Sequence, residues 1–391
     1  MRRISADERR ARLARRHRLA PADRAASALE AARSVVALHS TDPVTVYLSV
    51  RARTSGALPA DVDGALYDDR LLVRVLAMRR TLWVVPHDLL PAVLAGSTRA
   101  VAARERRRLE GFVRDSGIST RPAAWLGRAE RAALAAVEAR GEAFTTDVTR
   151  DVPMLATKLR LGVGTRFETT QSAAARVLPQ LAMDGKLLRG RPRGSWSNGQ
   201  YRWVPAARWL GDAIEQVDPA AAQAELLRRW LGAFGPGTET DLRWWTGWTA
   251  REVRAALAAV PHETVELDGG TGVVLAGDAE PVEPPRPWAA LLPILDPTTM
   301  GWKERGWYLG PHAETLFDAN GNAGPTVWWD GRVVGGWAQR RDGEIAYGVL
   351  EDVGADALAA IDAEAERLAE WLGEVRFSPG FLPPFQRGLA S

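Results

Sequence analysis

The sequence predicts an α+β fold in which three successive units, each made of helices followed by a strand pair, precede a compact β domain. Stretches with apolar residues at helical spacing are followed by short β-rich stretches around turn residues, and this order recurs along the chain. A proline-rich stretch, Ala279 to Pro287, then separates these units from a part with closely spaced turn signals. Because helices followed by a strand pair is the order of a winged helix, the sequence predicts three tandem winged-helix units.

The first unit is expected at residues 1–90. Ser5, with Glu8 three residues later, is typical of a capping box and predicts the start of the first helix. The other elements are predicted from apolar spacing and from Val, Leu and Trp content. They are a first helix ending near His17, a helix over Ala25–Leu38, a helix from Pro59 with Asp61 and Asp63 in its first turn, and two strands within Leu71–Pro86.

The same order is expected at residues 91–208 and 209–280. Their helices show apolar spacing, and their strand pairs follow glycine-containing turns. In the second unit these elements are a helix within Arg131–Gly141, a helix after Ser172 that contains Pro179, a turn at Asp184-Gly185 and a hairpin turn at Ser197 to Gly199. In the third unit they are a helix over Ala224–Phe234, helices capped by Thr238 and Thr249, and the strands ETVELDG and GVVLAG.

The C-terminal part, residues 281–391, has a different character. Asn320-Gly321, Asp330-Gly331 and Asp342-Gly343 are hairpin signals between short apolar runs. A helix is expected over Ala355–Leu372. A barrel-like or sandwich-like β domain fits this pattern.

The composition is that of an ordinary globular protein, with 46% hydrophobic and 25% charged residues. The absence of cysteine excludes disulfides, zinc-thiolate sites and a cysteine nucleophile, and agrees with a reducing cytoplasm. The basic N-terminus lacks the apolar segment of a signal peptide, and no run of about 18 apolar residues predicts a membrane span. We therefore expect a cytoplasmic protein without a membrane partner.

Nearly all the positive charge is carried by arginine, since only Lys158, Lys186 and Lys303 are lysines among 51 basic residues. Guanidinium groups bind phosphates with two parallel hydrogen bonds and stack on bases better than ammonium groups. Acidic residues reduce the net charge to +3, so a prediction of nucleic-acid binding depends on local clusters.

The stretch VVALHSTDPVTVYL places His39, Thr41 and Asp42 behind an apolar run and before Pro43. Since proline disfavours a helix before it, the helix is expected to end here, with the polar residues at its C-terminus. The helix dipole would then favour a protonated or proton-sharing His39. An imidazole near a carboxylate could hold a water for general-base chemistry. The same residues also suit a helix cap and turn, an alternative that the pattern leaves open.

Two clusters combine cations with aromatic residues, a pattern that suits phosphate contact and base stacking. The larger cluster is on strands expected to project into solvent; it comprises Lys186, Arg189, Arg191, Arg193 and Arg202 around Trp196, Tyr201 and Trp203. The smaller cluster comprises Arg74, Arg79 and Arg80. A solvated hairpin without a nucleic-acid partner is the alternative for both.

Tryptophan is frequent, with 16 in the chain. Trp244, Trp245 and Trp248 have helical spacing and are expected in the core of the third unit. Trp328 and Trp329 are neighbours in a predicted strand, so their side chains point to opposite faces. That hairpin, with Arg332 beyond it, is expected either to wedge into a duplex or to pack on a neighbouring domain.

Five stretches of the sequence, in chain order, carry a family resemblance. They are VVALHSTDPVTVYLSVRAR, LLVRVLAMRRTLWVVP, AFGPGTETDLRWWTG, LLPILDPTTMGWKERG and FDANGNAGPTVWWDGRVVGGW. Together they resemble the bacterial winged-helix DNA glycosylases of the AlkZ/YcaQ type, also called the HTH_42 superfamily. The resemblance covers nearly the whole chain.

The resemblance implies three tandem winged helices followed by a C-terminal β-barrel. It implies a monofunctional glycosylase that removes bulky or cross-linked N7-alkylpurines from double-stranded DNA, in some members as self-resistance to a genotoxic natural product. No metal or other cofactor is implied. A monomer associated with the nucleoid is expected, because several internal units on one chain are sufficient. The alternative is a DNA-binding protein or transcriptional regulator that keeps the fold without catalysis.

In that family the catalytic pair reads Gln-apolar-Gln or Gln-apolar-Asp, and here His39-Ser40-Thr41 takes its place, followed by Asp42-Pro43. An N7-alkylated guanine is a cationic leaving group, so the enzyme has to position water and stabilise an oxocarbenium-like sugar. Glutamine can orient a water, and histidine can also accept its proton. The resemblance therefore implies His39, Thr41 and Asp42 as catalytic residues. Its expected DNA contacts are Arg51, Arg53, Arg74, Arg79, Arg80, Lys186, Arg189, Arg191, Arg193, Trp196, Trp329 and Arg332.

Overall fold

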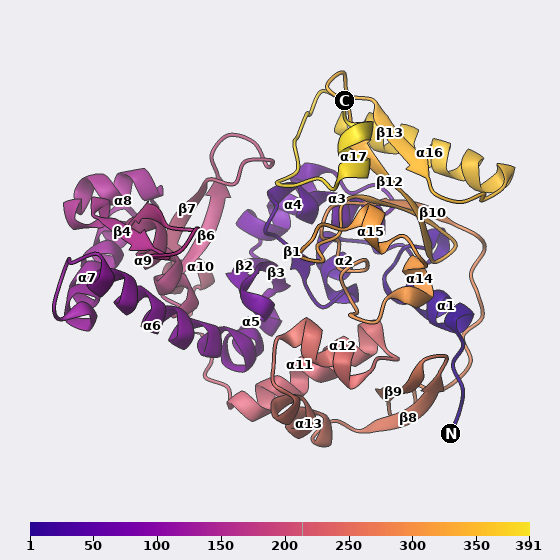
Figure 1. The fold of residues 1–391 in the computed structure, drawn as a ribbon, viewed down its shortest axis with the longest axis horizontal. Helices are drawn as coiled ribbons and strands as arrows, with labels where there is room; N and C mark the ends of the chain where they lie inside the picture. Colours follow the sequence, from indigo (N-terminus) through magenta and orange to yellow (C-terminus); the bar gives the residue numbers. More distant parts are fainter. Residues whose placement is uncertain (213) are drawn as a thin grey trace. The chain divides into compact units, whose positions relative to one another are not determined.

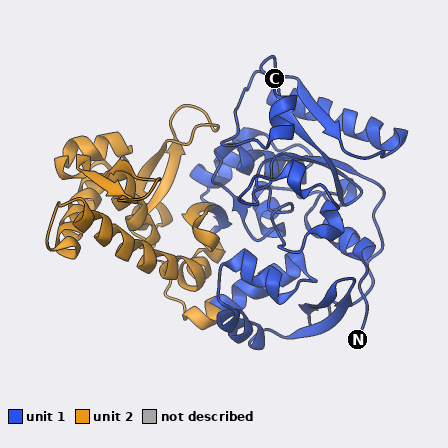
Figure 2. Cartoon of the chain, in the orientation of Figure 1, with its two compact units in different colours: residues 1–72, 83–86, 223–391 blue, residues 73–82, 87–222 orange. Residues whose placement is uncertain are grey.

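The computed structural model describes residues 1–212 and 214–391 as a mixed arrangement of helices and short antiparallel sheets (Figure 1). Figure 2 shows that the chain forms two compact units. The first unit contains residues 1–72, 83–86 and 223–391, and the second contains residues 73–82 and 87–222. The finer division into four domains stays a prediction.

The N-terminal helix begins where the sequence predicts. Helix α1 (Ala6–Arg16) has Ser5 as its N-cap, whose Oγ accepts a hydrogen bond from the Glu8 backbone N–H at 3.2 Å. The Glu8 carboxylate does not complete the box. It accepts hydrogen bonds from Arg2 and Arg12 and so fixes side chains on both sides of the helix start.

The expectation that a helix ends at Pro43 is wrong. Helix α2 (Ala28–Ser34) ends earlier, and Val36 has a φ of +65°, which a helix does not allow. Leu38–His39 form strand β1, which pairs with β3 (Leu82–Pro86). Pro43 instead starts helix α3 (Pro43–Arg53), because proline at the first helical position needs no N–H partner and already has a helical φ.

The rest of the first unit agrees with the predicted order of elements. Thr238 and Thr249 cap α12 and α13 with reciprocal capping boxes. The helices are α4 (Pro59–Asp63), α11 (Pro219–Phe234), α12 (Glu239–Thr246), α13 (Ala250–Ala258), α14 (Gly306–Leu309), α15 (Ala313–Leu316), α16 (Ala355–Leu372) and α17 (Pro384–Leu389). The strands are β8 (His262–Leu267), β9 (Gly270–Leu275), β10 (Ala289–Leu292), β11 (Thr326–Trp329), β12 (Arg332–Gln339) and β13 (Ile345–Val349).

The C-terminal strands form one open sheet and not the expected barrel. The antiparallel order is β10-β11-β12-β13, and within the described residues β10 and β13 are the two edges. Helices α3 and α16 contact β10 and so cover this part of the sheet (Figure 1). Four short strands are too few to close a barrel, so helices bury the sheet instead.

Aromatic side chains fill the core of the first unit. Trp328 has no exposed surface and stacks on Tyr308 with ring centroids 5.3 Å apart. Trp230, Phe234 and Trp302 form a further group with centroid distances between 5.2 and 6.5 Å. Trp245 and Trp248 are buried as predicted, whereas Trp244 is half-buried.

The second unit is built around two long helices and includes the hairpin predicted from Ser197 to Gly199. Its helices are α5 (Leu90–Val93), α6 (Arg99–Asp115), α7 (Pro122–Arg140), α8 (Thr145–Asp151), α9 (Ala174–Met183) and α10 (Ala206–Leu210). The strands in this part of the chain are β2 (Leu72–Leu76), β4 (Lys158–Leu161), β5 (Thr169–Ser172), β6 (Leu187–Pro192) and β7 (Tyr201–Pro205).

Local signals account for most boundaries of the second unit. Gly141, with a φ of +77°, ends α7 as predicted, and Pro179 is tolerated within α9. The β4–β5 hairpin was not predicted, because its strands are short and largely exposed. No helix within residues 1–212 and 214–391 has both the length and the apolar character that crossing a bilayer requires.

Candidate active site and nucleic-acid interface

His39 is held at the end of β1, opposite Trp83 on β3. Its side chain is 6% exposed and meets the Trp83 ring edge-on, with centroids 5.0 Å apart. Trp83 in turn lies 5.9 Å from the ring of Trp245. The imidazole is therefore held by strand β1 and by the Trp83 ring. It does not lie at a helix C-terminus, as the sequence suggested.

The hydrogen bond at Nδ1 constrains the chemistry of His39. Nδ1 accepts from the Thr41 backbone N–H at 3.4 Å, so a neutral ring carries its proton on Nε2. In that tautomer Nε2–H can donate a hydrogen bond to the oxygen of a water, and His39 can hold the water in this way. The ring can accept a proton only by losing the contact to Thr41, which at this length is weak.

Asp42 caps α3 and also holds a distant segment. One carboxylate oxygen accepts from Val44 N at 3.0 Å, and the other accepts from Gly380 N at 2.8 Å. Burial raises the pKa of Asp42, and the backbone N–H groups of Gly380, Val44 and Thr45 oppose this rise. These contacts match the cap-and-turn alternative, with Asp42 as an N-cap and not a C-cap.

Thr41 is exposed, whereas Ser40 and Asp42 are buried. The three residues implied as catalytic thus differ in their access to a ligand. Thr41 is exposed, His39 is 6% exposed, and both carboxylate oxygens of Asp42 accept hydrogen bonds from backbone N–H groups. The arrangement can hold one water near an imidazole, with Asp42 fixing the turn that carries it.

Arg51 and Arg53 lie in the interior. Arg53 has no exposed surface, and its guanidinium donates to Asp296 at 2.7 and 2.9 Å and to Thr298 Oγ1 at 2.7 Å. Burial would raise the pKa of Asp296, but Arg53, Ser49 and Thr298 hold it below its usual value. Arg51 forms an ion pair with the buried Glu364. These arginines hold α3 to the C-terminal region and do not form a phosphate-binding surface.

The hairpin β6–β7 carries the larger predicted cluster, and its cations differ in exposure. Lys186 and Arg193 are exposed, and the Arg193 guanidinium lies 4.2 Å from the Phe144 ring centroid. Arg191 and Trp196 are half-buried. The expectation that these strands hold their cations in solvent is therefore correct for only part of the cluster.

Arg189 and Arg74 face the interior of the second unit. Arg189 lies over Trp203 at 5.0 Å, and burial, with the nearby charge of Arg74, lowers the pKa of Arg189 to about 10. Arg74 lies 4.2 Å from the ring centroid of Tyr201. Both guanidinium groups lie over aromatic rings of their own unit. They therefore do not project toward a ligand, as the sequence suggested they would.

Arg79 and Arg80 are exposed in a tight turn, both with left-handed φ values of +54° and +60°. Arg80 pairs with Glu105 of α6 at 3.0 Å, and Arg108 pairs with the same carboxylate at 3.1 Å. Burial lowers the pKa of Arg176, and the nearby charges of Arg80 and Arg108 lower it further. Arg80 and Arg108 share one carboxylate here, with the charge of Arg176 near them, which leaves a local excess of positive charge.

Helix α6 is a basic element that the sequence reasoning missed. Arg104, Arg107 and Arg114 are exposed, and their spacing places them on one face of the helix. The run ERRR at 105–108, read together with helical spacing, was the available signal.

Trp329 and Arg332 belong to the hairpin β11–β12. Trp329 is half-buried, and Arg332 pairs with Glu351. The turn packs on α1, since a side-chain carbon added at Gly331 would lie 2.6 Å from Cβ of Arg10. Of the two alternatives for this hairpin, packing within the protein has direct support.

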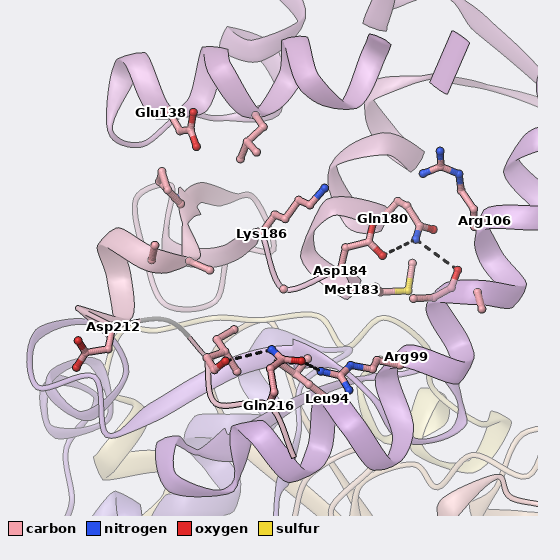
Figure 3. Close-up of a pocket in the computed structure, with 18 residues that line it drawn as sticks. Leu94, Arg99, Arg106, Glu138, Gln180, Met183, Asp184, Lys186, Asp212 and Gln216 are labelled. Carbon is pink, nitrogen blue, oxygen red and sulfur yellow. Dashed lines mark hydrogen bonds between the residues drawn. The ribbon is translucent and has the colours of Figure 1, made fainter. Parts of the chain in front are cut away.

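The second unit also contains a cavity of about 710 Å³ next to α6 and α9 (Figure 3). Gln180 Nε2 donates to Asp184 at 3.1 Å and to Ala102 O at 3.4 Å. Arg99 donates to Gln216. Acidic and basic side chains both line this cavity, and hydrogen bonds between the lining residues hold its walls. Because the acidic side chains would repel a polyanion, such a ligand is not favoured there.

A family model described as DNA glycosylase AlkZ-like matches residues 32–371. The chain belongs to the AlkZ-like DNA glycosylase family. Members of this family are hydrolases that act on N-glycosyl bonds. The match includes the His39 stretch, helix α6, the β6–β7 hairpin and the C-terminal sheet.

One relative is similar over most of its length. The interstrand DNA cross-link repair glycosylase of Streptomyces sahachiroi is 27% identical over 325 residues, which cover 79% of this chain and 81% of that protein. The solved structure of the Streptomyces sahachiroi DNA glycosylase AlkZ superposes with a TM-score of 0.72 at 22% identity, covering 96% of this chain and 98% of that one. This AlkZ-like chain therefore has the AlkZ fold.

Within the part of the chain that the structure describes, His, Asp and Glu side chains form no group suited to a metal ion.

Proposed function

We propose that this glycosylase releases bulky or cross-linked N7-alkylpurines from double-stranded DNA. The observation that carries the proposal is the family match over residues 32–371, together with a relative whose name states interstrand cross-link repair. The match includes the His39 stretch, and the resemblance implies that His39 stands in place of the first glutamine of the family motif.

In the proposed reaction the bond between C1′ of the sugar and N9 of the purine breaks. Its electron pair goes to the base and neutralises the positive charge of the alkylated ring. Water oxygen forms the new bond to C1′, and the water proton passes to His39 or to solvent. Because the leaving group is already cationic, the enzyme needs to supply chiefly water positioning and charge stabilisation.

His39 is the residue proposed to hold the water. With Nδ1 accepting from Thr41 N, its Nε2–H donates to the water and orients a lone pair toward C1′. Proton acceptance follows only if the ring gives up the Thr41 contact. Orientation is therefore the primary role of His39, and this is the role that a glutamine amide can also perform.

Thr41 and Asp42 have separate roles in this proposal. The exposed Thr41 hydroxyl is a second anchor for the water. Asp42 is a positioning residue that acts through the turn, because its oxygens are bound to Val44 N and Gly380 N. Its buried charge also contributes to the negative potential that favours a developing positive sugar.

We propose that exposed arginines of the second unit bind the DNA backbone. The strongest support is the exposed pair Arg80 and Arg108, which both bind the carboxylate of Glu105. Arg104, Arg107, Arg114, Arg193 and Lys186 extend this basic character. Such contacts fix a protein on the duplex without reading sequence. The helix-then-hairpin segments would serve as winged helices here, and one protein molecule is sufficient for them.

The proposal is tested with duplexes that carry N7-methylguanine, a bulky N7-alkylguanine or an interstrand cross-link. Purified protein should release the modified base, identified by mass, and leave an abasic site. Strand cleavage should need added base, because the chain has only three lysines to form a Schiff base. Tight binding to these duplexes without any base release would overturn the proposal and favour a non-catalytic DNA-binding protein.

A further inference from the structure

A large cavity of the first unit adjoins a segment that is hydrogen-bonded to the candidate catalytic stretch. It measures about 920 Å³, at the upper end of the 300–1,000 Å³ typical of small-molecule pockets. One wall is the C-terminal segment Phe381 to Pro384, and the opposite wall comes from α15 and the turn after it. The sequence reasoning assigned no role to either wall.

Asp42 connects this cavity to the candidate catalytic stretch. Its carboxylate accepts from Gly380 N at 2.8 Å, directly before the wall residues Phe381 and Leu382. The same carboxylate caps α3 two residues after Thr41 and three after His39. A ligand group in the cavity would therefore lie along a wall that is bonded to the turn carrying the catalytic residues.

An aromatic series makes a second, independent connection. Arg305 lines the cavity and lies over the rings of Phe317 at 4.7 Å and Trp244 at 5.0 Å. Trp245, the next residue along the chain, is in ring contact with Trp83, which meets the ring of His39. The two connections approach the His39 stretch through different elements, the C-terminal segment and α12.

The walls are fixed by hydrogen bonds and are not loose loops. Asp318 accepts from the backbone N–H groups of Asn320 and Asn322 at 2.8 Å, which closes the turn after α15. Lys303 N donates to Asp241 at 2.9 Å, and Arg387 donates to Leu382 O at 3.0 Å. The cavity is therefore formed before a ligand arrives.

The side chains suit a bulky, partly aromatic group attached to DNA. Apolar surface comes from Phe317, Phe381 and Leu382, with Pro383 beside them. Lys303 and Arg387, both exposed at the cavity, supply the positive charge that a flanking phosphate needs. Glu314 and Asp318 add negative charge on the side of α15, where a cationic alkylpurine is tolerated.

We infer that this cavity receives the bulky substituent of the alkylated purine and so sets the preference of the enzyme for large adducts. The inference rests on the proposed function, because it names the substrate group recognised beside the same site. A methyl group would leave the cavity unfilled. A drug-sized substituent would bury the walls and gain binding that a methyl adduct cannot provide.

The test compares excision of a bulky N7-alkylguanine with excision of N7-methylguanine, in duplexes of one sequence under single-turnover conditions. Phe381→Ala enlarges the cavity and removes an aromatic face, and Ala319→Trp fills it from the opposite wall. Each variant should lower the bulky-to-methyl ratio of the single-turnover rate constants about tenfold, in line with the loss of one stacking or pocket contact. Ala359→Trp, on the exposed face of α16, is the matched control and should leave the ratio unchanged.

Binding to uncleaved bulky-adduct duplex and the melting temperature are measured on the same variants. An unchanged bulky-to-methyl ratio in folded Phe381→Ala and Ala319→Trp proteins would overturn the inference and leave the proposed function standing. If the unaltered protein excises neither adduct, the proposed function fails. The binding preference for the bulky duplex then decides the inference, which requires that preference to fall in both variants.

Discussion

The arginines of the two units serve different purposes. In the first unit Arg53 is fully buried, with its guanidinium bound to Asp296 and Thr298. In the second unit Arg80 and Arg108 are exposed and share one carboxylate, Glu105. The same residue type holds a core in one place and leaves a surplus of positive charge on a surface in the other.

The difference shows that arginine content alone does not locate a DNA-binding surface. A buried guanidinium needs its carboxylate, since separating the pair leaves a charge in a low-dielectric interior. An exposed guanidinium gains little from a neighbouring carboxylate and can exchange it for a phosphate. Burial and the ratio of cations to carboxylates therefore decide which arginines are available to DNA.

The largest expected effect comes from breaking the buried pair. Arg53→Ala removes one partner and leaves Asp296 charged in the core, which should lower the free energy of unfolding by about 3–5 kcal/mol. Denaturant unfolding measures this loss. DNA affinity per folded molecule should stay the same, and a stable Arg53→Ala protein with weak DNA binding would reverse the assignment of this residue to the core.

Exposed arginines should show the opposite behaviour. Replacing Arg104, Arg107 and Arg114 together with alanine should reduce the slope of log affinity against log salt by up to about 0.9 per lost phosphate contact. The melting temperature should change little, since surface substitutions stay within about 0.5 kcal/mol. A matched triple at exposed arginines outside α6, namely Arg3, Arg251 and Arg341, should leave the slope unchanged. An unaltered slope in the α6 variant would remove this helix from the interface.

The core network of the first unit also predicts a response to pH. His17 is buried; its Nδ1 accepts from Thr298 Oγ1 at 2.8 Å and its Nε2 donates to Ala233 O at 3.1 Å. Burial and the nearby Arg53 charge lower the pKa of His17 to about 3. Since the unfolded chain binds the proton near pH 6.5, stability from this group is present above that pH and is lost as the pH falls toward 3.

At pH 5 this loss should be about 2 kcal/mol relative to pH 7.5, as the proton binds the unfolded state only. Unfolding curves at the two pH values measure it, and His17→Gln should flatten the dependence. Equal pH dependence in both proteins would show that other groups cause the acid sensitivity.

A smaller effect is expected at the cap of α3. Asp42→Ala removes the acceptor for Val44 N and Gly380 N and should cost about 1–2 kcal/mol, the usual range for an N-cap. Asp42→Asn keeps an acceptor and avoids burying a charge, so it should lose less. If thermal unfolding ranks these two variants in the reverse order, the carboxylate charge and not the cap stabilises this turn.

Much of the fold was predictable because its signals are local. Capping residues placed α1, α12 and α13, and turn glycines placed the end of α7 and the β6–β7 hairpin. The prediction from Pro43 was wrong, because a proline can follow the end of one helix or start the next. The pairing of β1 with β3, which separates α2 from α3, decides between these two possibilities. The open sheet was not predictable either, since strand order is a long-range property.

The candidate site was predictable as a stretch of sequence but not as a geometry. His39 and Thr41 were named from residue type and resemblance, whereas the tether from Asp42 to Gly380 joins positions 338 residues apart. The burial of Arg53 also depends on Asp296, which lies 243 residues further along the chain. Exposure of the α6 arginines could have been predicted from their helical spacing.

The central claim is that the His39 stretch holds the attacking water of a glycosylase. Single-turnover release of a bulky N7-alkylguanine by the unaltered protein, His39→Ala, His39→Gln and His39→Asn tests it most directly. Glutamine reaches the place of Nε2 and asparagine that of Nδ1, so Gln should keep most activity, and Asn and Ala should lose on the order of a hundredfold or more. Affinity for undamaged DNA should not change. Full excision by a well-folded His39→Ala protein would contradict the account.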